Sequence, residues 1–244
     1  MKKKGFKLLL LMLFASSILK ANYRSEIYSA FISNKMQDWK GVIDRMEAVS
    51  VKSDEFLLEV VNYHYGYIAW CLGIKKSDEA RKYLAMAEKD LEVLSANNKN
   101  SSMVNSYKSA FYGYRIALNK LNAPFLGPKS LQCAWQAVKT DHENPFGYLQ
   151  LGNTQFYKPR TFGGSKKEAL GYYLTAMRLM EKDKANTETN WNYLSILTLI
   201  AQSYYYTGDY KSSVQYLDRI LEIEPGYLWV KNELYQQVLK KMKG

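Results

Sequence analysis

The stretch Tyr193–Pro225, YLSILTLIAQSYYYTGDYKSSVQYLDRILEIEP, decides the fold of this chain. Laid on a helix-turn-helix period of about 34 residues, it places Thr207-Gly208-Asp209-Tyr210 at the turn between two helices. The packing positions of the two helices then fall on Ala201, Tyr204, Ser213, Leu217 and Ile220, with Pro225 at the end. Helix pairs of this kind bury their faces against neighbouring pairs and leave a concave surface, which favours binding over catalysis.

A second copy of the pattern runs from Pro145 to Met180, with Gly152 where two helices approach closely. Its long connection ends at Ser165, which has capping-box spacing to Glu168. In the pair before it, the sequence predicts an extended connection over Asn119–Pro128 and a helix from Lys129, so that every proline lies in a loop or at a helix start. The expected units are 23–51, 54–94, 102–141, 145–181 and 191–225, with a capping helix over 227–243.

These residues resemble the tetratricopeptide repeat family over nearly all of the chain after residue 21. The segments Ala123–Ser130 and Tyr157–Leu170 are similar to a subgroup of exported bacterial members. The resemblance implies an all-α fold, a right-handed superhelix of about five antiparallel helix pairs with a C-terminal capping helix. It also implies a concave groove that holds a peptide, a partner protein or a small ligand, and it implies no enzymatic activity.

Residues 1–21 have the layout of a secretory signal peptide, because lysines precede the apolar run Leu8–Phe14 and small residues follow it. The run is shorter than the roughly 20 residues that a membrane span needs, and no later segment is apolar enough. We therefore expect an exported protein, periplasmic or secreted, with no membrane span in residues 22–244, which form a single domain.

Charge and cysteine content exclude several classes of function. The formal charge of +11 includes five basic residues of the leader; without them, 29 basic residues face 23 acidic ones, and a net charge of +6 does not predict nucleic-acid binding. Cys71 and Cys133 both fall in predicted helices, where they are either two buried thiols or one disulfide. The spacing of the cysteines and of His64 and His142 predicts no metal site, and no cofactor motif is present.

The inward face of each first helix supplies the candidate groove, together with two nearby arginines. The candidates are Tyr63, Tyr67, Trp70, Tyr114, Arg115, Asn153, Phe156, Tyr157, Arg160, Gln202, Tyr205 and Tyr206. Tyrosine suits recognition because it joins an apolar face to a hydroxyl, and arginine pairs with carboxylates. The alternative for the tyrosines is a packing role, and for the arginines solvated loop positions.

Three functions follow from these residues. The first is a non-catalytic module that holds a peptide or partner protein of the cell envelope. The second is an accessory protein of a transport system that binds a small organic anion. The third, a hydrolase, would need a pair of titratable groups, for which His64 near Glu59 is the one suggestion, against a structural histidine.

Overall fold

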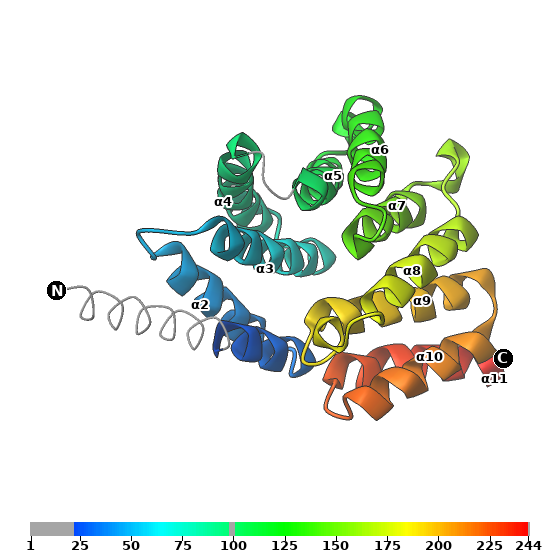
Figure 1. The fold of residues 1–244 in the computed structure, drawn as a ribbon. Coiled ribbons are helices and arrows are strands. Elements are labelled where there is room, and N and C mark those ends of the chain that lie inside the picture. The colour runs from blue at the N-terminus through cyan, green and yellow to red at the C-terminus, as the bar shows by residue number, and fades with distance from the viewer. Residues whose placement is uncertain (1–21, 98–100, 244) are drawn as a thin grey trace.

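The computed structural model describes residues 22–97 and 101–243, and the expected leader at 1–21 lies outside this part of the chain. The described residues form helices and no strand, which confirms the all-α prediction. The helices pack as consecutive antiparallel pairs (Figure 1): residues 22–32 with α2 (Met36–Glu47), α3 (Asp54–Gly73) with α4 (Ser77–Ala96), α5 (Ser101–Leu118) with α6 (Ala123–Thr140), α7 (Pro145–Tyr157) with α8 (Lys166–Met180), and α9 (Trp191–Thr207) with α10 (Tyr210–Ile223). Shorter elements complete the chain: η1 (Lys120–Asn122), η2 (Arg160–Phe162), η3 (Lys184–Asn186), the π-helical η4 (Val230–Leu234) and α11 (Tyr235–Lys243).

Polar residues and a glycine set the helix ends at the predicted turns. Gly208 has a φ of +85°, the left-handed conformation that ends α9, and Asp209 then caps the start of α10. Ser165 caps α8, because its hydroxyl accepts a hydrogen bond from the amide of Glu168 at 3.1 Å. The reciprocal half of the capping box is replaced, since the Ser165 amide donates to the carbonyl of Gln155.

Helix α6 begins earlier than the sequence suggested. An extended connection was expected over Asn119–Pro128 with a helix from Lys129, whereas α6 starts at Ala123. Pro124 occupies the first helical turn, where its missing N–H is not needed. Pro128 lies inside the helix, where one backbone hydrogen bond is lost. The prediction that every proline lies in a loop or at a helix start is therefore wrong for Pro128.

Two glycines let aromatic rings lie directly on helix backbones. A Cβ atom on Gly152 of α7 would lie 2.4 Å from the ring of Tyr173 in α8. A Cβ atom on Gly66 of α3 would lie 2.6 Å from Trp39 and 2.8 Å from Trp191. Because real Cβ contacts are not this short, only glycine fits at either position. The close approach predicted at Gly152 is confirmed.

The first helix pair packs against the C-terminal half of the molecule. Arg24 donates to three backbone carbonyls in the connection between α8 and α9, at 2.8 to 3.2 Å. Tyr28 donates to Glu224 at 3.0 Å, and the ring of Phe31 lies 4.9 Å from that of Tyr227. Figure 1 shows the result: the helix pairs form an arc whose blue N-terminal end meets the yellow segment before α9 and the turn after α10. The first pair is therefore not an isolated end.

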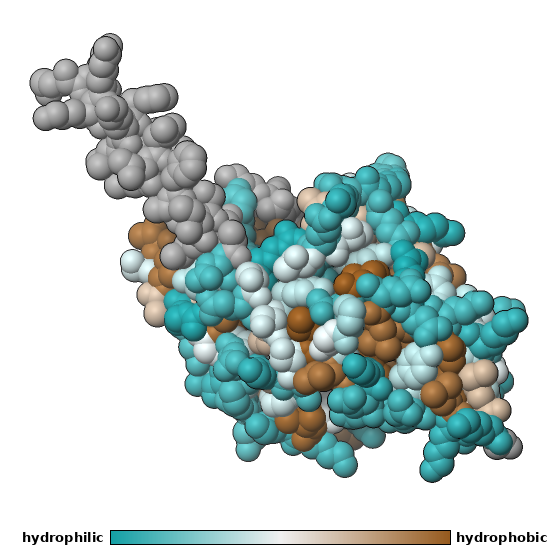
Figure 2. Space-filling model, turned by 90° about the horizontal axis from the view of Figure 1, so that it is seen from below, coloured by the Kyte–Doolittle hydropathy of each residue, from teal (hydrophilic) through white to brown (hydrophobic). Residues whose placement is uncertain are grey.

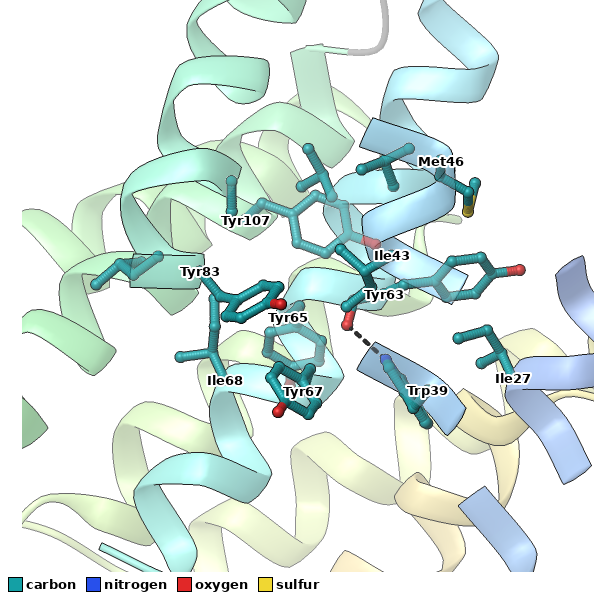
Figure 3. Close-up of a cluster of buried hydrophobic side chains, with 14 of the residues drawn as sticks. Ile27, Trp39, Ile43, Met46, Tyr63, Tyr65, Tyr67, Ile68, Tyr83 and Tyr107 are labelled. Atoms are coloured by element: carbon teal, nitrogen blue, oxygen red, sulfur yellow. Dashed lines mark hydrogen bonds between the residues drawn. The ribbon is translucent and has the colours of Figure 1, made fainter. Parts of the chain in front are cut away.

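Two hydrophobic cores stabilise the arc. One joins the first helices to α3, α4 and α5 and includes Trp191 from α9, while the other joins α7 to α11. Figure 3 shows the first core, in which aromatic and aliphatic side chains point toward one another from several helices. There the indole of Trp39, fully buried, donates to the carbonyl of Tyr63 at 3.0 Å. Trp191 contributes to this core from a distant part of the sequence, so it links the two halves.

The surface is mostly polar on the face drawn in Figure 2, where apolar atoms emerge in several separate groups. Cys71 and Cys133 are both unpaired, the first buried and the second half-buried. Among the described residues, no helix combines the length and apolar character needed to cross a membrane.

Candidate functional site

Aromatic side chains gather where α7 and α9 end. We call Phe156, Tyr157, Tyr205 and Tyr206 the aromatic strip. The rings of Phe156 and Tyr157 are 5.0 Å apart, those of Phe156 and Tyr206 5.7 Å, and those of Tyr205 and Tyr206 5.2 Å, all edge to face. Phe156 is buried, whereas Tyr157 and Tyr206 are 69% and 59% exposed. No hydrogen bond within the described residues holds the hydroxyl of either exposed tyrosine. The strip thus offers two available aromatic faces beside a buried ring.

A lysine accompanies the strip. The ammonium group of Lys166, near the start of α8, lies 3.6 Å from the centre of the Phe156 ring and 5.2 Å from that of Tyr206. It also donates to the carbonyl of Phe156. Burial lowers the pKa of Lys166 below its ordinary value. The strip therefore combines aromatic surface with a fixed cation, an arrangement that suits a ligand with both a ring and an anionic group.

The strip continues toward a second group of tyrosines on α3 and α5. The rings of Tyr65 and Tyr114 are stacked with centres 5.7 Å apart, and the Tyr114 hydroxyl donates to the carbonyl of Tyr65. The surrounding protein, together with Tyr65 and Tyr206, raises the pKa of Tyr157 to about 12, so its phenol is neutral at physiological pH. Asn153 also contacts Tyr65, so the helix that carries Tyr157 reaches this second group.

Asn153 has a structural role beside these rings. Its amide donates to the Tyr65 hydroxyl at 3.2 Å and to Gln150 at 3.0 Å, and its carbonyl oxygen accepts from Tyr173 at 2.9 Å. Because its hydrogen-bonding groups already have partners, Asn153 orients the wall rather than presenting free groups to a ligand.

Two of the residues predicted to line the groove, Tyr63 and Tyr67, lie in the packed interior of the N-terminal half, and a third, Trp70, lies at its edge. Tyr63 and Tyr67 are 3% and 0% exposed, and Tyr67 packs between α3 and α4. Trp70 is half-buried, stacks on Tyr67 and carries the ammonium of Lys76 over its ring at 5.2 Å. The ring of Tyr63 meets Trp39 of α2, and that of Tyr67 meets Tyr83 of α4. Both rings therefore pack between helices, which was the alternative that the sequence left open.

The two predicted arginines do not converge. Arg115 donates twice to Glu88, at 2.5 and 2.6 Å, and this pairing raises its pKa. Arg160 is exposed in η2, in the connection after α7. Gln202 is half-buried in α9. Arg160 thus stays available near the strip, whereas Arg115 is engaged elsewhere.

One buried group of titratable side chains was missed by the sequence. His64 does not pair with Glu59, which accepts from Tyr63 instead; its Nε2 lies 2.6 Å from a carboxylate oxygen of Glu47, and Asp90 lies beside them. Burial alone would raise the pKa of Glu47, but hydrogen bonds from His64 and a lysine outweigh it and lower that pKa. Burial and the charge of Glu47 raise the pKa of Asp90 to about 7. This group lies among α2, α3 and α4, not in the aromatic strip.

Other residues of the site could also not be identified from a sequence pattern. Tyr65 and Trp191 meet with ring centres 6.2 Å apart although 126 positions separate them, and Lys166 reaches Phe156 across a connection. Their positions depend on how the two ends of the arc meet, and no local sequence spacing predicts that contact. Helical periodicity did place Phe156, Tyr157, Tyr205 and Tyr206 on first-helix ends, and the structure brings these four together.

No family model matches the sequence, and no curated protein matches it either. Among solved structures, the chain is similar to the HusA haemophore from Porphyromonas gingivalis, with a TM-score of 0.56. The two share 17% identity, and the match covers 75% of this chain and 92% of that one. At this identity the similarity concerns the fold: an all-helical chain built from consecutive helix pairs, shared with a haemophore.

Proposed function

We propose that this chain is an exported binding protein that holds a flat aromatic ligand bearing carboxylates, of the porphyrin class, on the aromatic strip. The observation that carries the proposal is the pair of exposed rings, Tyr157 and Tyr206, on either side of buried Phe156. Folded proteins usually pack tyrosine rings of this size or bind their hydroxyls. Two neighbouring rings with unengaged hydroxyls are therefore a surface available for stacking.

The charges beside the strip favour an anionic ligand. Lys166 lies within 5.2 Å of the Tyr206 ring centre, and Arg160 is exposed on the following connection. Carboxylates pair with both side chains, most strongly with arginine. A porphyrin joins a planar aromatic body to carboxylate side groups, so it matches both features. The shared fold with a haemophore supports this ligand class over other flat anions.

A peptide groove is less well supported than the strip. The middle of the arc is filled by side chains that a peptide would have to displace: Tyr65 and Trp191 are 9% and 6% exposed, and each packs against other rings. What stays open is an edge formed by helix ends rather than a continuous trough. An edge of this size fits a compact ligand.

A partner protein is a second candidate, favoured by a different observation. Leu121, Phe125 and Phe162 are 81%, 74% and 76% exposed, in η1, in the first turn of α6 and in η2. Large apolar side chains that are exposed together at a surface are typical of protein contacts. Such a partner could receive the ligand without occupying the strip.

A haemin titration tests the proposal. Purified protein is titrated with haemin while the porphyrin absorption band and tryptophan fluorescence are recorded, and protoporphyrin IX and the dimethyl ester of haemin are run in parallel. We expect saturable one-to-one binding that the double variant Tyr157→Ala/Tyr206→Ala weakens tenfold or more, a loss of about 1.4 kcal/mol. The ester should bind less tightly than haemin, and Arg160→Ala should reduce that difference.

Trp135→Ala is the matched control. Trp135 is 49% exposed on α6 and packs edge-on to Tyr172, outside the strip. This variant loses a larger ring from the surface but should keep the affinity of the unchanged protein. Equal haemin affinity in the unchanged protein and the double tyrosine variant would overturn the assignment of the strip.

A further inference from the structure

A second chemically distinct site lies in the N-terminal half, between three helices. Glu47 ends α2, His64 lies in the middle of α3 and Asp90 lies in the second half of α4. One ligand atom from each of these side chains lies within 4.8 Å of the other two. The residues are 17 and 26 positions apart, so the fold and not a local motif brings them together.

The cluster contains polar atoms without partners. His64 is fully buried and Asp90 is 8% exposed. The Nε2 atom of His64 lies 2.6 Å from Glu47, but Nδ1 of His64 and Oδ2 of Asp90 have no hydrogen-bond partner in the described part of the chain. Each such atom costs about 1 to 3 kcal/mol when it is buried unpaired, and native proteins rarely leave it so. An ion bound within the cluster would give Oδ2 of Asp90 a partner.

We propose that Glu47, His64 and Asp90 bind a divalent transition-metal ion of the zinc class. One imidazole nitrogen and two carboxylate oxygens are ligands that zinc takes in proteins, with a water molecule as the usual fourth ligand. Two carboxylates also balance the charge of a divalent ion. Ligand atoms about 2.1 Å from a tetrahedral ion lie about 3.4 Å apart. The observed spacings of 2.6 Å and up to 4.8 Å bracket that value.

Lys52 is the competing counter-ion, and its position leaves room for a metal. Its ammonium contacts Oε2 of Glu47 at 2.5 Å, whereas Oε1 of Glu47 faces His64. No hydrogen bond joins Lys52 to Asp90 within the described residues, so Oδ2 of Asp90 remains available to an ion. The side chains of Lys52 and Glu47 keep 15% and 17% exposure, which gives an ion access from the connection between α2 and α3.

Zinc binding by the full chain, without an affinity tag, tests this site. Protein treated with a chelator and then desalted is dialysed against ZnCl2, and bound zinc is measured per chain beside the thermal unfolding temperature. We expect one zinc per chain and a rise in unfolding temperature of about 5 °C or more when zinc is in large excess over its dissociation constant. Cobalt in place of zinc should give visible absorption bands from a site of nitrogen and oxygen ligands.

Substitutions of two proposed ligands and of the other histidine test where the zinc binds. Asp90→Asn is nearly isosteric and should lose the bound zinc, the temperature rise and the cobalt bands, and His64→Gln should do the same. His142→Gln removes the other histidine of the chain, which is exposed beside Glu143, and should keep all three. Should Asp90→Asn bind zinc as the unchanged protein does, or should the unchanged protein take up none, the site assignment fails.

Discussion

Two groups of tyrosines in the molecule have opposite environments. In the N-terminal half, Tyr63, Tyr67 and Tyr83 are buried, and each hydroxyl donates to a carboxylate at 2.6 to 2.7 Å. At the end of the C-terminal half, Tyr157 and Tyr206 are exposed and their hydroxyls have no such acceptor among the described residues. A buried phenol needs a hydrogen-bond acceptor, whereas one at a recognition surface has to remain available. The nearby acidic residues therefore separate core tyrosines from candidate contact tyrosines.

The charged groups beside the two sets of tyrosines differ in the same way. Burial, and then the carboxylates of Glu79 and Asp44, raise the pKa of Tyr67 and Tyr83 far above the ordinary value, so these side chains stay neutral donors. Beside the strip the charged groups are cations, Lys166 and Arg160. The buried group thus uses tyrosine for stability, and in the proposed function the aromatic strip offers tyrosine to an anionic aromatic ligand.

The substitution with the largest expected effect on stability removes the side chain that links the two halves. Trp191→Ala removes a ring that is 6% exposed and lies 4.9 Å from the Trp39 ring and 5.8 Å from that of Phe31. Deletion of a buried tryptophan typically costs about 3 to 5 kcal/mol of unfolding free energy. Urea unfolding followed by circular dichroism measures the loss. A cost below about 1 kcal/mol would show that the N-terminal pair does not depend on α9.

Local sequence signals accounted for most of the helices. The turn at Gly208-Asp209 and the cap at Ser165 specify helix ends through backbone conformation and one side-chain acceptor each, both of which lie within a few residues. Proline misled the prediction for α6, because a helix can hold a proline such as Pro128 one turn after its start when packing compensates for the lost hydrogen bond.

The site was only partly predictable because its decisive contacts are long-range. Periodicity identifies Tyr67 and Tyr206 as residues of the same kind on equivalent helices, and it cannot report that α4 covers the first while the second meets solvent. The closure that seats Trp191 beside Trp39 and the meeting of Glu47 with Asp90 depend on the curvature of the whole arc. Small rotations accumulated between successive pairs set that curvature.

The second prediction tests the buried carboxylates that distinguish the N-terminal half. The pKa of Asp90 is raised from 3.8 to about 7, first by burial and then by Glu47, against the smaller opposing effects of Lys52 and Lys89. An acid whose pKa is higher in the folded than in the unfolded protein contributes stability that is fully present below its unfolded pKa. This stability is lost as the pH rises through the folded pKa. Asparagine cannot ionise. The unfolding free energy of Asp90→Asn, relative to that of the unchanged protein, should therefore rise by about 1 to 2 kcal/mol when the pH goes from 5 to 8.

Urea unfolding at both pH values, with a chelator present so that metal does not contribute, gives the measurement. Glu88→Gln on the same helix is the control, because its carboxylate is half-buried and already paired with Arg115. A difference between Asp90→Asn and the unchanged protein that stays constant with pH would show that Asp90 does not ionise in this range.

The substitutions with the smallest expected effect compare one tyrosine from each half directly. Tyr67→Phe removes a hydroxyl that donates to Glu79 at 2.7 Å, and the carboxylate keeps its lysine partners, Lys40 at 3.0 Å and Lys76 at 3.9 Å. We expect a loss of about 1 kcal/mol in unfolding free energy, the usual net value of such a hydrogen bond. Tyr206→Phe removes a hydroxyl with no partner and should change stability by less than about 0.5 kcal/mol. The same unfolding measurement is made on both variants, because each keeps its ring and loses only its hydroxyl. Equal losses would mean that carboxylate acceptors do not separate the two classes of tyrosine.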